Sequence, residues 1–331
     1  MLVIRQSEVE RLLPVGDCVA VMRGAMLATS ARAVTLPLRQ YLAVPAADGE
    51  TAGSLAMMPG TLGDPACFGI KLVCKYPRPH GDPLGSHVGM VLLFDTAKGV
   101  PLALIEGSSL TAIRTSAASA LATDLLARRD AARLAVIGNG EQAMRHVTAM
   151  MAVRPITSVT VWGRDEARRA DFVRAVTQHT GLACTPCASV AAAVDGADII
   201  CTTTSARTPV LFGADLQPGQ HLNLVGSAVA TTAEVDDAAV ARARVFVDYR
   251  PAADAAAGEL IGALARGVIT QDHVIGEIGE VAAGRVEGRM ADGDITLYKS
   301  LGVASQDLAA AHALWQAAQR QGLGVNIDLL A

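Results

Sequence analysis

The sequence predicts an α/β protein with one doubly wound domain and one α+β domain. Three observations predict it: the length of 331 residues, an alternation of short apolar runs with helical patterns in the middle of the chain, and closely spaced strands in the first 120 residues. At about 150 residues per domain, this length corresponds to roughly two domains.

The first 120 residues predict strands at about 34–44, 54–58, 67–75 and 88–94. Because no helix separates the last two, this sheet is at least partly antiparallel. The strand at 88–94 is almost continuously apolar, which favours burial on both faces, one of them by a second subunit. A helix over 109–128, with Ser108 or Ser109 as its cap, then leads into the next domain.

The middle of the chain predicts a parallel sheet with crossover helices. Strands are expected at 133–138, 158–162, 197–203, 221–225 and 244–248, and helices at 141–152, 165–179 and in the alanine-rich tract 252–265. A last helix at 304–320 is expected to pack on the first domain. The predicted domains are therefore 1–124, completed by 304–331, and 125–303.

Composition excludes several classes of protein. The chain is 51% hydrophobic, so it can form a core, and its net charge of -4 offers no basic surface for nucleic acid. No apolar run reaches the length of a membrane span, and the first residues do not resemble a signal peptide. The six cysteines are scattered, Cys184 and Cys187 form an isolated CxxC pair, and the histidines do not cluster, so no metal is predicted and a cytoplasmic location is expected.

A glycine-rich turn follows the first strand of the middle region. Gly138, Gly140, Glu141, Gln142 and Ala143 belong to a GxGxxA pattern between a strand and a helix. Glycine permits the tight turn and the close approach of a pyrophosphate, and the helix N-terminus supplies N–H donors. The pattern predicts a Rossmann-type dinucleotide site, and the loops 202–205 and 226–228 at later strand ends are expected to line it.

The end of the second strand favours NADP over NAD. An NAD site usually has an acidic residue at this position to bind the ribose hydroxyls. Here the strand ends in Trp162-Gly163-Arg164, and Arg164 can pair with a 2′-phosphate. Asp165, one residue later, keeps NAD possible.

Several separated blocks resemble the ornithine cyclodeaminase/mu-crystallin family. They are LPLR at 36–39, MP at 58–59, GIK at 69–71, the stretch from 89 to 122 that contains LTAIRTSAAS, VIGNGEQA at 136–143, GEIGEVAAGRVEGR at 276–289 and TLYKSLG at 296–302. The resemblance covers almost the whole chain. It implies a homodimer with an N-terminal substrate and dimerisation domain and a Rossmann domain.

The resemblance assigns a cationic substrate pocket to Arg39, Lys71 and Arg114. Arg114 also follows from the pattern, because it shares a helix face with apolar residues, where a guanidinium needs an anion. An internal salt bridge to Glu106 or another acid is the alternative for Arg114, and a surface position is the alternative for Lys71.

Further site residues are expected from the same resemblance. Ser86 corresponds to a Ser/Thr near the cofactor. His87 beside it is either a structural histidine or a proton donor, and Lys71 and a bound water are the other candidate donors. Thr203, Thr204 and Ser227 are expected at the cofactor, since they belong to the two loops at strand ends.

One departure from the family pattern bears on the reaction. Cyclodeaminases and alanine dehydrogenases of the family have an Asp six residues before a Glu in the segment after the strand at 221–225. Here that position, counted back from Glu234, is Ala228. Ornithine cyclisation needs a base there, so cyclodeaminase activity is disfavoured.

We therefore expect NAD(P)H-dependent reduction of a small α-imino acid, of the Δ1-pyrroline-2-carboxylate or Δ1-piperideine-2-carboxylate type, to an L-amino acid. The alternatives are ornithine cyclodeaminase, an open-chain imine reductase or amino-acid dehydrogenase acting for instance on iminosuccinate, with Arg78 or His80 for the second carboxylate, and a crystallin-like protein that binds NADPH without turnover.

Overall fold

The computed structural model describes residues 1–46, 51–78, 82, 84 and 87–329. The chain forms two compact units, residues 1–114 with 303–331 and residues 115–302, and each is described by itself below. The division lies inside helix α3 (Gly107–Leu126), before the predicted domain limit at 124.

The first unit contains a mixed sheet with the strand order β16-β1-β7-β6-β5-β4-β2, and β3 pairs with β4. Among the described strand pairs only β1–β7 is parallel, so the prediction of a partly antiparallel sheet is confirmed. The predicted strand 34–44 is two separate strands. The strands are β1 (Leu2–Ile4), β2 (Val34–Thr35), β3 (Gln40–Pro45), β4 (Thr51–Leu62), β5 (Cys67–Lys75), β6 (His87–Asp95), β7 (Pro101–Glu106) and β16 (Val325–Asn326).

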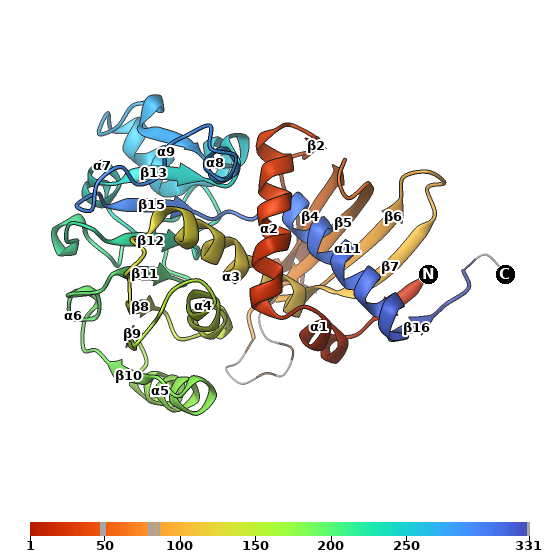
Figure 1. Ribbon diagram of the computed structural model, residues 1–331, viewed down its shortest axis with the longest axis horizontal. Coiled ribbons are helices and arrows are strands. Elements are labelled where there is room, and N and C mark those ends of the chain that lie inside the picture. The colour runs from red at the N-terminus through yellow and green to blue at the C-terminus, as the bar shows by residue number, and fades with distance from the viewer. Residues whose placement is uncertain (47–50, 79–81, 83, 85–86, 330–331) are drawn as a thin grey trace. The chain divides into compact units, whose positions relative to one another are not determined.

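Helices cover one face of this sheet. Helix α11 (Ala304–Gln321) packs on the strands, α1 (Gln6–Leu12) contacts β7 and α11, and α2 (Val15–Ser30) packs on α11. The start of α3 belongs to the same unit. Helix α11 packs against α2 and against β4, β5 and β6, as Figure 1 shows, so the C-terminal helix belongs to the first unit as predicted. Among the described helices, none is by itself long and apolar enough to cross a membrane; α1 and α2 reach that length and apolarity only as a pair, bent by 83°.

The two faces of the sheet differ in burial. Val91 and Leu93 of β6 are fully buried, whereas Met90 is 44% exposed. In the single chain only the helix-covered face of this strand is buried, so burial of the other face by a second subunit stays a prediction. Strand register places Lys71 opposite Val91, on the buried face, and Leu72 opposite Met90, on the other.

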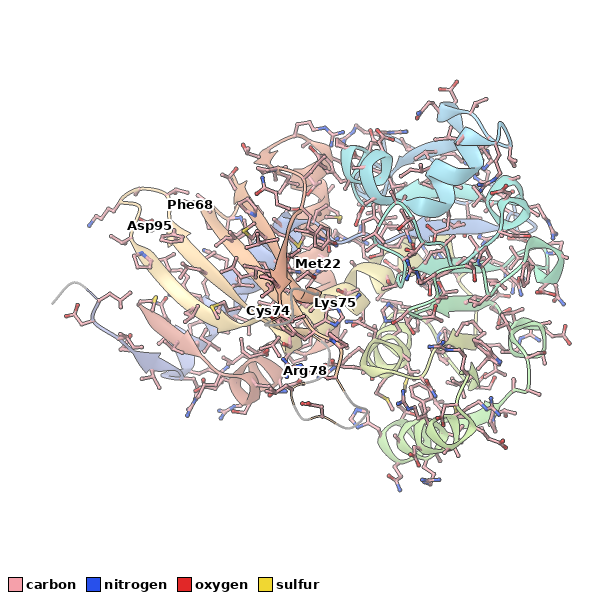
Figure 2. The ribbon with its side chains drawn as sticks, turned by 180° about the vertical axis from the view of Figure 1, so that it is seen from behind. Met22, Phe68, Cys74, Lys75, Arg78 and Asp95 are labelled. Carbon is pink, nitrogen blue, oxygen red and sulfur yellow. The ribbon has the colours of Figure 1, made fainter. Side chains whose placement is uncertain are left out.

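Figure 2 shows how β5 runs from one end of this sheet to the other, with Phe68 and Asp95 at one end and Cys74 and Lys75 at the other. Phe68 stacks on Phe94 of β6, with ring centroids 5.0 Å apart. This cross-strand aromatic pair stabilises the β5–β6 register, which in turn determines which β5 side chains reach the helices.

The second unit is a fully parallel sheet, which confirms the predicted doubly wound fold. Its strand order is β10-β9-β8-β11-β12-β15-β13-β14. All five predicted strands are present, and β10, β14 and β15 were not predicted. The strands are β8 (Arg133–Ile137), β9 (Ser158–Trp162), β10 (Ala183–Pro186), β11 (Ile199–Thr202), β12 (His221–Leu224), β13 (Arg244–Val247), β14 (Val274–Glu277) and β15 (Thr296–Lys299).

Crossover helices connect these strands, with the alanine-rich tract forming two of them. The helices are α4 (Glu141–Met151), α5 (Glu166–Thr180), α6 (Val190–Val194), α7 (Asp237–Arg242), α8 (Arg250–Ala256), α9 (Gly258–Ala265) and α10 (Ile278–Ala282). The strand order reverses between β8 and β11, and ligands of doubly wound sheets bind at the carboxyl ends of the strands at such a point.

The start of α3 corrects the predicted cap. The helix begins at Gly107, so Ser108 and Ser109 lie in its first turn. Their N–H groups donate to the carboxylate of Glu106, at 2.6 and 2.9 Å. Glu106 therefore satisfies the helix start, because an acidic side chain is favoured at the positive end of the helix dipole, and it is not the partner of Arg114.

Candidate functional site

The turn between β8 and α4 has the geometry of a pyrophosphate cradle. Gly138 has φ +115°, and a Cβ there would lie 2.8 Å from Thr203 Oγ1. Gly140 is the N-cap of α4 and makes no side-chain capping bond, and a Cβ on it would meet nothing within 4 Å. Open space over an uncapped N-terminus of an eleven-residue helix fits a bound phosphate group.

Two buried polar atoms beside this turn strengthen the fit. Asn139 Nδ2 and Gln142 Oε1 are buried and have no hydrogen-bond partner in the described chain. Such groups are costly unless something pairs with them. A Cβ on Gly163, after β9, would lie 2.7 Å from the Asn139 amide, so glycine there makes room for this side chain. The residues of the turn fit a dinucleotide, and Asn139 is a site candidate that was not predicted.

Glu234 holds together the carboxyl ends of β11 and β12. Its buried carboxylate accepts from Thr202 Oγ1, from the N–H and Oγ1 of Thr204 and from the N–H of Gly226, each at 2.7 Å. The hydroxyl of Thr204, predicted at the cofactor, is therefore committed to Glu234. That of Ser227 bonds to Thr232 Oγ1 at 2.7 Å, and Ser227 is 1% exposed.

A buried ion pair contacts the segment after β12 that contains Ser227 and Glu234. Lys299 Nζ lies 3.3 Å from the Glu259 carboxylate, and both side chains are fully buried. Lys299 also donates to the Ser227 carbonyl, and Glu259 accepts from the N–H of Glu234 at 3.0 Å. Ala228, at the position of the missing base, is partly buried against the core of this unit. The loop is thus held by its backbone, and position 228 offers only a methyl group.

The strand end at β9 leaves Arg164 exposed. The Asp165 carboxylate accepts from the N–H of Arg168 at 2.9 Å and caps α5. Arg169 donates to the Gly163 carbonyl at 2.9 Å, which fixes the turn. The Asp165 carboxylate thus caps α5, whereas the Arg164 side chain is exposed at the surface.

The first unit brings together two of the predicted cations. Lys71 and Arg114 are both 3% exposed. Asp307 Oδ1 accepts from Lys71 Nζ and from Arg114 Nε, each at 2.8 Å, and Gln306 Oε1 accepts from Arg114 Nη1 at 2.7 Å. β5, α3 and α11 contribute these side chains, which lie on the helix-covered face of the sheet. A surface position for Lys71 is excluded, and the acid facing Arg114 is Asp307.

The charges of this cluster influence one another strongly. Burial and the Arg114 charge lower the pKa of Lys71 to about 7, although Asp307 opposes them. Burial raises the pKa of Asp307, but Arg114 and Lys71 more than offset this and hold it below its ordinary value. Asp307 is therefore ionised at neutral pH, and Lys71 is poised between its charged and neutral forms.

The charges of Arg39 and His87 are coupled to this cluster. Arg39 Nη1 donates to Tyr41 Oη at 3.1 Å, and its charge lowers the pKa of Lys71 slightly. The surrounding protein and the charges of Lys75, Lys71 and Arg39 lower the pKa of His87 to about 4. His87 is thus neutral near pH 7. Ser86 and His80 lie outside the described residues.

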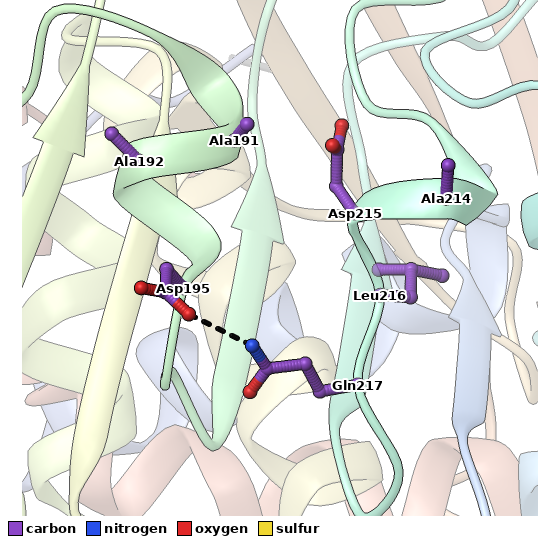
Figure 3. Close-up of a pocket in the computed structure, with 7 residues that line it drawn as sticks. All are labelled: Ala191, Ala192, Asp195, Ala214, Asp215, Leu216 and Gln217. Carbon is purple, nitrogen blue, oxygen red and sulfur yellow. Dashed lines mark hydrogen bonds between the residues drawn. The ribbon is translucent and has the colours of Figure 1, made fainter.

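A surface hollow of about 360 Å³ in the second unit does not coincide with these residues. Residues of α6, Asp195 after it and the segment 214–217 line it, as Figure 3 shows. Gln217 Nε2 donates to Asp195, at 2.8 Å. Asp195 and Gln217 precede β11 and β12, so the hollow lies toward the amino ends of these strands, opposite the glycine turn. Its lining is mostly alanine and carboxylates, which does not indicate an anionic or dinucleotide ligand.

The sequence pattern did not reveal four functional candidates, which are Asp307, Gln306, Glu259 and Asn139. The signal for Asp307 was an acid on an apolar helix, with Ala310 and Ala311 at the following turn, all of them buried. This is the same argument that singled out Arg114 on α3.

Comparison with known proteins agrees with this geometry. The model of the ornithine cyclodeaminase/mu-crystallin family matches residues 1–322. A Δ1-pyrroline-2-carboxylate reductase of Bacillus cereus is 35% identical over 99% of this chain and 100% of its own length. The structure of the Δ1-pyrroline-2-carboxylate reductase of Thermococcus litoralis with NADH and L-proline has a TM-score of 0.93, with 31% identity over 99% of this chain and 100% of that one.

An archaeal alanine dehydrogenase dimer with bound NAD is also similar, with a TM-score of 0.90 and 28% identity over 100% of this chain and 99% of that one. The matched range extends through both units. The chain belongs to the ornithine cyclodeaminase/mu-crystallin family.

Proposed function

We propose that the protein is an NAD(P)H-dependent reductase of a small cyclic α-imino acid, with Δ1-pyrroline-2-carboxylate or Δ1-piperideine-2-carboxylate as substrate and an L-amino acid as product. The observation that carries the proposal is the buried Lys71–Arg114 pair, which has a single carboxylate between its two cations. The cluster keeps a net positive charge while Lys71 is protonated, and a monocarboxylate compensates it. The similarity to two Δ1-pyrroline-2-carboxylate reductases supports the same substrate class.

Arg114 and Lys71 bind and orient the substrate's carboxylate. The planar guanidinium of Arg114 suits a carboxylate held at two points, and the Lys71 ammonium adds a point charge. Arg39 contacts the outer side of the same carboxylate in this proposal. Holding the imine in one orientation is the main contribution of these residues to the rate.

The second unit holds the dinucleotide. Gly138, Gly140, Glu141, Gln142 and Ala143 form the turn and first helical residues that receive the pyrophosphate. Thr203 packs against this turn, and Ser227 and Thr204 shape the loops at the ends of β12 and β11. A bound reduced nicotinamide supplies the hydride that the reaction requires.

We further propose that NADP is preferred to NAD. Arg164 at the end of β9 is exposed and can pair with a 2′-phosphate. The Asp165 carboxylate caps α5 by accepting a hydrogen bond from the N–H of Arg168. The similar structures contain NADH or NAD, so NAD is the alternative cofactor.

The protonation requirement distinguishes this reaction from cyclodeamination. An imine that binds as an iminium ion carries its own proton, so the methyl group at Ala228 is compatible with reduction. Where a proton is needed, Lys71 is the better donor, because its pKa is about 7, whereas that of His87 is about 4. Ornithine cyclodeamination, reduction of an open-chain imine such as iminosuccinate and NADPH binding without turnover remain the alternatives.

We also propose a homodimer in the cytoplasm. The uncovered face of the first sheet exposes Leu42 by 54% and Met90 by 44%, and a second copy of the chain would cover it. The similar alanine dehydrogenase is a dimer. The six cysteines are unpaired, which suits a reducing compartment.

Absorbance of NADPH and NADH, followed with a panel of cyclic and open-chain α-imino acids, tests the proposed reaction. Wild type should oxidise the cofactor with cyclic imines, and Arg114→Ala should lose at least about a hundredfold in kcat/KM, because a buried charged contact to the substrate is removed. Tight NADPH binding without turnover of any imine would reject the reductase and favour the binding protein, and release of ammonia from ornithine would favour the cyclodeaminase.

A further inference from the structure

The Lys71–Arg114 pair depends on an acid that comes from the other end of the chain. Asp307 lies 236 positions from Lys71 and 193 from Arg114 in the sequence. Its Oδ1 accepts from both cations at 2.8 Å, so the two positive groups lie within two hydrogen-bond lengths of each other. Two like charges at that separation in a buried site repel each other unless an anion lies between them.

We propose that Asp307 is a positioning residue, whose carboxylate holds the Lys71 ammonium beside the Arg114 guanidinium and favours the protonated form of Lys71, which receives the substrate's carboxylate. The inference rests on the proposed function for the identity of that substrate. The contact between Asp307 and the two cations does not depend on it.

The remaining contacts of the cluster support this role. Asp307 Oδ2 is buried without a hydrogen-bond partner in the described chain, so the carboxylate is kept in place by its bonds to the two cations. Gln306 binds the far side of Arg114 through its Oε1, and its Nε2 lies 3.6 Å from Met26 Sδ of α2. Adjacent residues in the first turn of α11 therefore orient the same guanidinium.

Asp307 is the only carboxylate that forms an ion pair with Lys71 or Arg114 among the described residues. Apart from Arg114 and Asp307, the charge that acts on Lys71 is that of Arg39, before β3. The charges of Lys71, Arg39 and Lys75 lower the pKa of His87 on β6, and the charge of Arg114 acts on Cys18 of α2. Arg39, like Arg114, disfavours the charged form of Lys71, and His87 is neutral near pH 7. Removing the negative charge of Asp307 should therefore release the proton of Lys71 at lower pH.

Carbon-13 NMR of lysine labelled at Cε measures the pH at which Lys71 loses its proton. The spectrum is simple, because the chain has only four lysines, Lys71, Lys75, Lys98 and Lys299. Lys71→Met assigns the Lys71 signal. In wild type that signal should titrate near pH 7, and in Asp307→Asn its midpoint should fall by at least about one pH unit. Ser305→Ala is the matched control: it removes a buried bond of the same helix, to Thr29 Oγ1 at 2.7 Å, and should leave the Lys71 midpoint unchanged.

An unchanged or higher Lys71 midpoint in Asp307→Asn would overturn the inference. Asp307→Glu covers the case in which the Asn variant does not fold. It keeps the charge on a longer stem, so Lys71 should titrate as in wild type, while the Kd for pyrrole-2-carboxylate, a planar probe of the substrate class, should rise about tenfold. A fall of the Lys71 midpoint in the Glu variant would contradict the proposal as well.

The two proposals can fail separately. A lower Lys71 midpoint in Asp307→Asn, in a protein that reduces no imine, would support the role of Asp307 and reject the proposed reaction. Imine reduction with a Lys71 midpoint that does not respond to Asp307→Asn would support the proposed reaction and reject the role of Asp307.

Discussion

Buried charge is the dominant feature at the scale of single residues. Arg114 is surrounded on α3 by Leu110, Ala118 and Leu121, all of them fully buried. Removing a guanidinium or an ammonium from water costs several kcal/mol per ion unless anions compensate it. Asp307 compensates one of the two charges, so the cluster retains the positive charge that a carboxylate ligand can use.

Binding of a carboxylate should weaken as the pH rises through about 7. The reason is that Lys71 is protonated below its pKa of about 7 and neutral above it. Isothermal titration calorimetry with pyrrole-2-carboxylate between about pH 6 and pH 9 should show a Kd that rises by up to tenfold per pH unit on the alkaline side. Lys71→Met should bind more weakly but without this dependence, and a constant Kd in wild type would argue against Lys71 as a ligand of the carboxylate.

Arg164 should discriminate between the two cofactors. Arg164→Ala is expected to raise the Kd for NADPH about tenfold and to leave that for NADH unchanged, because only NADPH has a 2′-phosphate. Fluorescence titration of both cofactors measures the ratio. Arg168→Ala, on an exposed position of the following helix, is the comparison variant. Equal effects of Arg164→Ala on both cofactors would show that Arg164 does not recognise the phosphate.

At the scale of elements, the turn between β8 and α4 requires glycine for two different reasons. Gly138→Ala should destabilise the second unit by about 1–3 kcal/mol, because φ is +115° and the added methyl would press on Thr203. Gly140→Ala has ordinary backbone angles and free space, so the fold should persist while dinucleotide affinity falls. Thermal unfolding and NADPH titration separate the two effects. Unimpaired cofactor binding in both variants would reject this turn as the pyrophosphate site.

Glu234 connects the ends of two strands and should be needed for the shape of the cofactor loops. Glu234→Ala leaves the hydroxyls of Thr202 and Thr204 and two N–H groups without their acceptor. The expected cost is about 2–4 kcal/mol of unfolding free energy, together with weaker NADPH binding. Urea unfolding measures the first and fluorescence titration the second. Asp254→Asn, which alters an exposed carboxylate on α8, should change neither.

At the scale of the whole molecule, one face of the first sheet is apolar and partly exposed. Leu42, Leu72 and Met90 share this face through the pairing of β3, β4, β5 and β6. If it is the dimer interface, Met90→Asp with Leu42→Asp should convert a dimer into a monomer, because two charges would be buried without partners. Light scattering after size-exclusion chromatography gives the mass. Met290→Asp, at a 65% exposed position of the second unit, is the control, and an unchanged mass in the double variant would reject this interface.

The sequence alone determined the features that depend on local pattern. Alternation of apolar runs and helices predicted the parallel sheet, the glycine spacing predicted the turn after β8, and an isolated charge on an apolar helix face pointed to Arg114. These signals lie within one or two turns of chain, so no knowledge of packing was needed. The same local reasoning missed β15, a four-residue strand that lies between β12 and β13 in the sheet although it follows both in the chain.

Only the tertiary structure decided which groups meet across long separations in sequence. Asp307 joins Lys71 and Arg114 because α11 packs on the same face of the sheet that Lys71 occupies, and Glu106, which is much nearer to Arg114 in sequence, is used instead to cap α3. Likewise, the Thr204 hydroxyl donates to Glu234, and the Ser227 hydroxyl is hydrogen-bonded to that of Thr232. The partner of a buried polar group depends on which faces pack together, and residue spacing along the chain does not encode that choice.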